Sequence, residues 1–134
     1  TYGSEVRSRS LSEKFVFLVA MSGATALARQ PIGVVRADAD LREVLAAAMR
    51  ETVAVAAAHG VVFGETFVDR QMSFVDGLPA EMRSSMLNDL LAGNRLEAPW
   101  LAGAVARMAK AAGLQAPVNA TVYAALKPYL GGAR

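Results

Sequence analysis

Residues 83–97, Arg-Ser-Ser-Met-Leu-Asn-Asp-Leu-Leu-Ala-Gly-Asn-Arg-Leu-Glu, have the pattern of a short capped helix followed by a stop. A serine hydroxyl accepts hydrogen bonds from the free N–H groups at a helix start, so Ser84 or Ser85 is expected to cap this helix. Gly93 is expected to end it, because glycine readily adopts a left-handed conformation. The free N–H groups and the helix dipole at the first turn favour a bound anion. Glu97 follows, at the start of the next predicted helix.

The rest of the chain also has the pattern of helices. Of its 134 residues, 27 are alanine, the best helix former, and strand signals are nearly absent. Ser10 with Glu13 and Asp40 with Glu43 match the capping box that opens a helix. Gly103 lies among alanines, and this small face predicts close packing against another helix. We therefore predict an all-α bundle of about six helices, over residues 10–29, 40–59, 64–75, 84–93, 99–113 and 117–130.

Length, charge and composition exclude several classes of protein. A chain of 134 residues is one domain with a core of useful size. It has no cysteine and a formal net charge of +2 with scattered basic residues, so neither disulfides nor a nucleic-acid surface is expected. Its apolar stretch at residues 15–28 is interrupted by polar residues and is shorter than the ~20 residues of a membrane span. Residues 1–12 do not resemble a signal peptide, and we expect a cytoplasmic protein without membrane contact.

A lysine opens a mixed stripe on the first long helix. Lys14, Leu18, Met21, Ser22 and Thr25 recur at helical spacing and share one face. The lysine has two interpretations: a side chain that extends from the end of a buried helix into solvent, or a general acid that protonates a carbonyl oxygen. The residues alone favour the first interpretation.

Other functional motifs are absent from the sequence. It contains no glycine-rich dinucleotide fingerprint, phosphate-binding loop, serine-nucleophile elbow or zinc-protease motif. His59 is the only histidine, so no metal site is expected. Ser85 and Glu97 lie where helix starts ordinarily carry a capping serine and a carboxylate. Taken alone, the residues indicate a helical module of a larger protein.

Three segments nevertheless resemble the C-terminal domain of the ketopantoate reductase (2-dehydropantoate 2-reductase) family: residues 13–15, 82–103 and 116–128. The resemblance spans residues 11–128 and implies a helical domain similar to the C-terminal domain of 6-phosphogluconate dehydrogenase. Such reductases carry NADPH on an N-terminal Rossmann domain. The chain is therefore expected to be the second domain only, to have that Rossmann domain as its partner, and to be inactive in isolation. The implied activity is the reduction of ketopantoate to pantoate in pantothenate biosynthesis.

The resemblance also implies roles for four residues. Lys14 corresponds to the family's catalytic lysine, which would protonate the 2-oxo group of the substrate as hydride arrives. Ser85 corresponds to the serine that binds the substrate carboxylate. Glu97 corresponds to an active-site glutamate, which would bond to the substrate or the cofactor ribose and influence the protonation of the lysine. Asp89 corresponds to a position to which we assign a structural role.

The sequence departs from the family pattern where substrate is bound. Leu18 and Ser22 stand where the family commonly has two asparagines that touch the substrate, four and eight residues after the lysine. Ala102 and Ser12 replace a further asparagine and a tryptophan. A leucine cannot form the hydrogen bonds of an amide, so we expect a more apolar pocket and a changed substrate preference.

Two alternatives remain open. The first is a related reductase that acts on another 2-oxo acid through the same residues. The second is a non-catalytic helical module for dimerisation or binding, whose site has been lost through the changes at Leu18 and Ser22. A strand followed by G-x-G-x-x-G upstream of the chain would favour an enzyme. The mean hydropathy of +0.30 fits either a homodimer interface or a face that a Rossmann domain covers.

Overall fold

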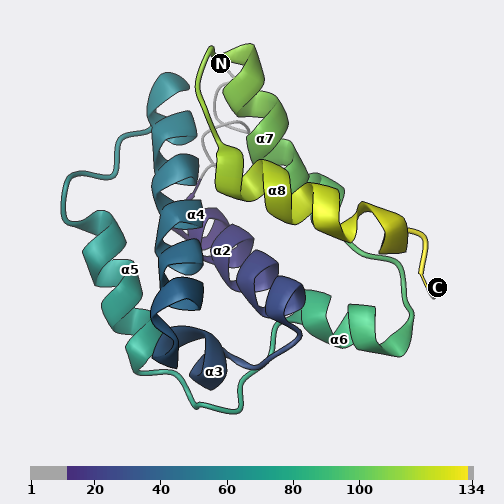
Figure 1. Ribbon diagram of the computed structural model, residues 1–134. Helices are drawn as coiled ribbons and strands as arrows, with labels where there is room; N and C mark the ends of the chain where they lie inside the picture. Colours follow the sequence, from purple (N-terminus) through teal and green to yellow (C-terminus); the bar gives the residue numbers. More distant parts are fainter. Residues whose placement is uncertain (1–11, 133–134) are drawn as a thin grey trace.

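The computed structural model describes residues 12–132, and this part of the chain is all-α, as the sequence predicts (Figure 1). Within this range no strand is present, and two short 3₁₀ helices accompany seven α-helices. The elements are α2 (Glu13–Ala28), α3 (Ile32–Ala37), α4 (Ala39–Ala58), α5 (Phe67–Asp76), α6 (Ser85–Ala92), η1 (Ala98–Trp100), α7 (Ala102–Ala111), α8 (Pro117–Leu126) and η2 (Lys127–Tyr129).

The helix starts differ from the prediction at the first two long helices. Ser12 caps α2, its hydroxyl accepting a hydrogen bond from the Phe15 N–H at 3.3 Å, whereas the predicted cap Ser10 lies outside the described residues. Asp38 caps α4 in place of the predicted Asp40. The helix α3 was not predicted. The pair Gln30-Pro31 is expected to end the first predicted helix, at residues 10–29, but Pro31 also lies at the N-cap of α3, and the chain resumes a helix immediately after it.

The fifth predicted helix is divided in two. Residues 98–100 form the 3₁₀ turn η1, and the α-helical hydrogen bonds of α7 begin only at Ala102. Leu101 separates them with φ −116° and ψ −98°, which is outside the helical region. Pro99 therefore lies in a short separate turn, which places Glu97 before η1 rather than at the start of a long helix.

α2 is the central helix of the domain. It packs against α3, α4, α6, α7 and α8, and most of its second half is buried (Figure 1). A Cβ atom added to Gly23 would lie 3.2 Å from Cγ1 of Val122, so the glycine lets α2 approach α8 closely. Gly103 does the same for α7, because its Cβ would lie 2.9 Å from the ring of Tyr123. The close packing predicted at Gly103 is confirmed.

A carboxylate from α4 holds the start of α8. The two side-chain oxygens of Glu51 accept hydrogen bonds from the backbone N–H groups of Val118 and Asn119, each at 2.9 Å. The Asn119 side chain is buried and also donates to Glu51 at 2.9 Å. A negative charge suits a helix N-terminus, since the free N–H groups there carry partial positive charge. This contact fixes α8 against α4, and sequence analysis did not single out Glu51.

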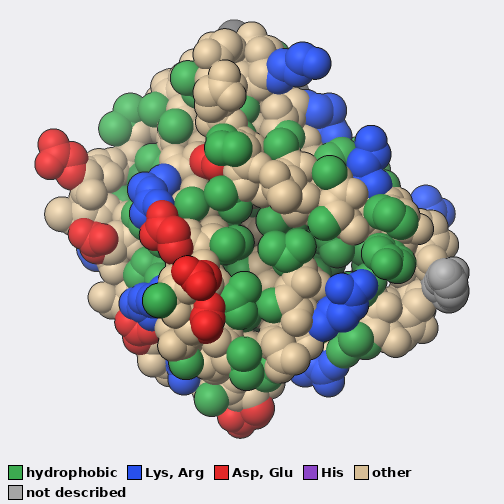
Figure 2. Space-filling model, in the orientation of Figure 1, with side chains coloured by type: hydrophobic (Ala, Val, Ile, Leu, Met, Phe, Trp, Pro, Cys, Tyr) green, Lys and Arg blue, Asp and Glu red, His purple; other side chains and the backbone are tan. Residues whose placement is uncertain are grey.

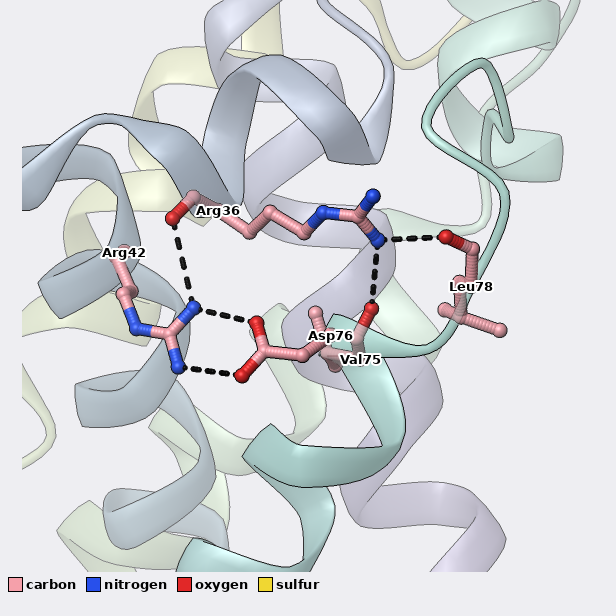
Figure 3. Close-up of polar contacts among 5 residues, drawn as sticks. All are labelled: Arg36, Arg42, Val75, Asp76 and Leu78. Carbon is pink, nitrogen blue, oxygen red and sulfur yellow. Dashed lines mark hydrogen bonds and ion pairs between the residues drawn. The ribbon is translucent and has the colours of Figure 1, made fainter.

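Two arginines connect α3 and α4 to the end of α5 (Figure 3). Arg36 donates hydrogen bonds to the carbonyl oxygens of Val75 and Leu78, at 2.9 and 2.6 Å. Arg42 forms a two-pronged ion pair with Asp76, at 2.7 and 2.9 Å. The hydrogen bonds from Arg42 lower the pKa of the Asp76 carboxyl below its ordinary value. These contacts hold the chain in place just before the segment that leads to α6.

Figure 2 shows apolar side chains spread over the visible face of the domain. Acidic side chains lie mainly over the half that contains α4 and α5, whereas many lysines and arginines lie singly over the half that contains α6, α7 and α8. Of the helices in residues 12–132, none is both long and apolar enough to cross a bilayer.

Candidate substrate pocket

A pocket of about 510 Å³ lies where α2 meets α6. This volume is within the range of small-molecule binding sites, roughly 300–1,000 Å³. Its walls come from three parts of the chain: one face of α2, the segment that leads into α6 together with the first turns of α6, and the region around η1. The lining residues are Phe17, Leu18, Met21, Ser22, Met82, Arg83, Ser84, Ser85, Met86, Asp89, Glu97 and Leu101.

The pocket brings together four of the five residues proposed to bind or act on substrate, and also Asp89, to which a structural role was assigned. Leu18 and Ser22 come from successive turns of α2, Ser85 from the start of α6, and Glu97 from the segment before η1. Lys14 is not among the lining residues. It is exposed on α2, on the same face as Leu18 and one turn earlier, about 6 Å along the helix axis.

The segment that leads into α6 is held by the start of α3. The N–H of Ile32 donates to the carbonyl of Met82 at 2.9 Å, and the N–H of Gly33 donates to the carbonyl of Ala80 at 2.8 Å. A Cβ atom on Gly33 would lie only 2.7 Å from both Cβ and the carbonyl oxygen of Ala80. The absence of a side chain at Gly33 therefore permits this close contact, which positions Met82 and Arg83 in the pocket wall.

The two neighbouring serines have different surroundings. Ser84 is buried and caps α6, because its hydroxyl accepts a hydrogen bond from the Leu87 N–H at 3.0 Å. The same hydroxyl lies 2.6 Å from the Thr25 hydroxyl on α2, which ties the two helices together. Ser85 is the first residue of α6 and is exposed, and its hydroxyl makes no hydrogen bond to any described residue. Of the two cap candidates, Ser84 performs that role and leaves the Ser85 hydroxyl available to a ligand.

Glu97 and Asp89 supply the carboxylates of the pocket. The backbone just before Glu97 is fixed by a hydrogen bond from the Leu96 N–H to the carbonyl of Leu130, at 3.1 Å. Asp89 accepts a hydrogen bond from the Asn94 side chain at 3.3 Å, across the turn that ends α6 at Gly93. Gly93 has φ +76°, so the predicted left-handed stop is confirmed. Within the described residues, no cluster of three or more His, Cys, Asp or Glu side chains suits a metal ion.

Five of the twelve residues that line the pocket were not predicted from the sequence. Phe17, Met82, Arg83, Met86 and Leu101 line the pocket but were not proposed as site residues. The apolar members of this set match the pattern of ordinary core positions, so their periodicity does not separate core from pocket. Arg83 could have been found from its position beside the capping serine, because a helix start at that place is suited to bind an anion.

The fold and the pocket define an all-α domain with a pocket between two of its helices. Residues 8–130 match the family model described as "Ketopantoate reductase PanE/ApbA C terminal". The chain therefore belongs to the ketopantoate reductase family, as its motifs predicted, and corresponds to the C-terminal domain. This family consists of oxidoreductases.

Relatives of known sequence or structure agree with this assignment. An uncharacterized oxidoreductase, YkpB of Bacillus subtilis (strain 168), is 30% identical over 90% of this chain and 40% of its own length. A 2-dehydropantoate 2-reductase of Halobacterium salinarum is 36% identical over 85% of this chain and 37% of its own. The dimeric ketopantoate reductase of Staphylococcus aureus has a TM-score of 0.83 and 29% identity, over 88% of this chain and 41% of its own. The chain thus spans about two fifths of these proteins.

Proposed function

We propose that this chain is the substrate-binding part of an NADPH-dependent reductase that converts 2-oxo acids to 2-hydroxy acids. The main support is the convergence of Leu18, Ser22, Ser85 and Glu97, from separate parts of the sequence, in one pocket. Ketopantoate is the reference substrate of the family, and a paralogue with another 2-oxo acid would use the same residues.

The carboxylate of the substrate would bind at the start of α6. The Ser85 hydroxyl, which has no hydrogen-bond partner within residues 12–132, can donate a hydrogen bond there, and Arg83 contributes a positive charge to the same wall. Ser84 cannot serve in this way, because its hydroxyl is already engaged by Leu87 and Thr25. The helix dipole adds to the attraction for an anion at this end.

Lys14 would donate the proton that the reduction requires. Its flexible side chain extends from the turn of α2 before Leu18, so the ammonium can reach a 2-oxo group at the mouth of the pocket. Its charge would also stabilise the negative charge that develops on the oxygen atom. NADPH would supply the hydride and would be bound mainly by a separate domain, since residues 12–132 contain no strand and the sequence no dinucleotide fingerprint. Glu97 is exposed beside the pocket and can accept hydrogen bonds from ribose hydroxyls.

The role of Lys14 can be tested by substitution in the full-length protein. Lys14→Ala should lower kcat by roughly a hundredfold or more, the usual contribution of a general acid, with a smaller change in KM. Lys110→Ala, at an exposed position in the last turn of α7, is the matched control and should leave turnover unchanged. Near-normal kcat in Lys14→Ala would rule out the proton-donor role.

A further inference from the structure

We propose that this pocket selects 2-oxo acids whose side chain is apolar and carries no hydroxyl group, in preference to ketopantoate. The inference rests on the proposed function and specifies its substrate class. It follows from the order of polar and apolar side chains along α2 and from the methionines that face that helix.

The polar end of the pocket lies where α2 meets the start of α6. Thr25 and Ser84 are in hydroxyl contact at 2.6 Å, which places this part of α2 beside the α6 N-terminus. Ser22 is one turn before Thr25, and only 6% of its surface is exposed. Ser22 lines the pocket, and its hydroxyl makes no hydrogen bond to another residue within 12–132. Ser22 and Ser85 therefore provide two hydroxyls at the end proposed to receive the carboxylate.

The α2 wall becomes apolar away from that end. Leu18 is one turn before Ser22, about 6 Å further along the axis, and it contributes no hydrogen-bonding group. Phe17 and Met21 lie beside it in the same wall. A substrate hydroxyl placed against these side chains would lose its hydrogen bonds to water and gain no partner, which disfavours the hydroxylated substrate.

Methionines form much of the remaining surface. Three of the six methionines of the chain, Met21, Met82 and Met86, line this one pocket. Methionine is unbranched and polarizable, so it adapts to apolar groups of different shapes. The pocket should therefore accept branched aliphatic and aromatic side chains alike, while a hydroxyl held against the wall around Leu18 finds no partner there.

A matched pair of substrates tests the inference. Trimethylpyruvate is ketopantoate without its hydroxyl group, so the two compounds differ only in the feature at issue. The assay is kcat/KM of the full-length protein with NADPH for both compounds and for phenylpyruvate. We expect kcat/KM to be about 10- to 100-fold higher for trimethylpyruvate than for ketopantoate, the scale at which apolar pockets discriminate against an added hydroxyl. Phenylpyruvate should also exceed ketopantoate.

Substitution of Leu18 tests whether this residue causes the preference for apolar substrates. Leu18→Asn restores an amide at a position that is 37% exposed, so the fold should tolerate it, and the preference should shift toward ketopantoate by about 10-fold or more. Leu91→Asn makes the same change on the exposed side of α6, outside the pocket, and should leave the preference unaltered. A shift in both variants, or in neither, would contradict the assignment to Leu18.

The outcomes separate this inference from the proposed function. A higher kcat/KM for ketopantoate than for trimethylpyruvate overturns the apolar preference and leaves the reductase function intact. If Ser22→Ala lowers the turnover of ketopantoate but not that of trimethylpyruvate, Ser22 binds the substrate hydroxyl. That result would also overturn the apolar preference. Absence of turnover with every 2-oxo acid, while NADPH still binds, overturns the proposed function and the inference with it.

Discussion

Ser84 and Ser85 are adjacent in sequence, and we predict that one stabilises the fold while the other binds substrate. Ser84 is buried, caps α6 and contacts Thr25. Ser85 is exposed, and its side chain makes no hydrogen bond within residues 12–132. The substitutions Ser84→Ala and Ser85→Ala remove the same atom one residue apart, so each serves as the control for the other.

The magnitudes follow from the hydrogen bonds that each change removes. Ser84→Ala loses the cap on the Leu87 N–H, worth about 1 kcal/mol, and the contact with the Thr25 hydroxyl, worth about another 1 kcal/mol. The Thr25 hydroxyl keeps its hydrogen bond to the Met21 carbonyl at 2.7 Å, so this donor stays paired in the variant. The expected loss is therefore about 2 kcal/mol in the free energy of unfolding. For Ser85→Ala the change in the free energy of unfolding should be no more than about 0.5 kcal/mol, as for substitutions at other exposed positions.

Equilibrium unfolding in urea, followed by far-UV circular dichroism, measures the stability difference. Turnover of the full-length protein measures substrate binding by Ser85. Loss of a hydrogen bond to the charged substrate carboxylate should raise KM about 10-fold in Ser85→Ala. KM for Ser84→Ala should change much less at temperatures where that variant is folded. The reasoning is refuted if Ser85→Ala is the more destabilised variant, or if only Ser84→Ala raises KM.

Three further predictions concern the contacts that support the pocket. Glu51→Ala should lower the free energy of unfolding by about 2–3 kcal/mol, because the N-terminus of α8 loses three hydrogen bonds; Glu51→Gln should cost less in the same urea titration. Gly33→Ala should cost about 1–3 kcal/mol and raise substrate KM, because the new methyl group would displace the backbone at Ala80; unaltered stability would contradict this. Asp76→Asn should cost no more than about 1 kcal/mol at pH 7, since the side chains of Asp76 and Arg42 are 49% and 38% exposed. The pKa of Asp76 is lowered in the folded state, so the ion pair stabilises the protein fully above the ordinary pKa of 3.8. The difference in stability between the variant and the unmodified protein should decrease below that pH and vanish as the pH falls through the lowered pKa of the folded state.

The helical class was predictable from sequence because alanine content and helix-end signals act locally. Gly93 illustrates this, since its stop depends on backbone conformation alone. The helix start at Pro31 was misjudged because proline both ends one helix and suits the first turn of the next, and only the surrounding packing decides between these roles.

The pocket was predictable only in part. Ser85, Leu18, Ser22 and Glu97, which line the pocket, were found through the resemblance to the ketopantoate reductase family, since helix patterns alone do not assign them a role in binding. The wall formed by Met82 and Met86 depends on hydrogen bonds from α3 to a distant segment, and no local pattern encodes such a contact. The distinction between Ser84 and Ser85 likewise required the position of Thr25, 59 residues away from Ser84 in the sequence.

The central claim is that this domain serves the reduction of 2-oxo acids, and the most direct test is NADPH oxidation by the full-length protein over a panel of such acids. The panel should include ketopantoate, trimethylpyruvate and phenylpyruvate, with absorbance at the nicotinamide band as the readout. We predict saturable oxidation that depends on the 2-oxo acid. If NADPH binds but none of these acids is reduced, the claim is contradicted, and the helical domain must serve binding or dimerisation instead.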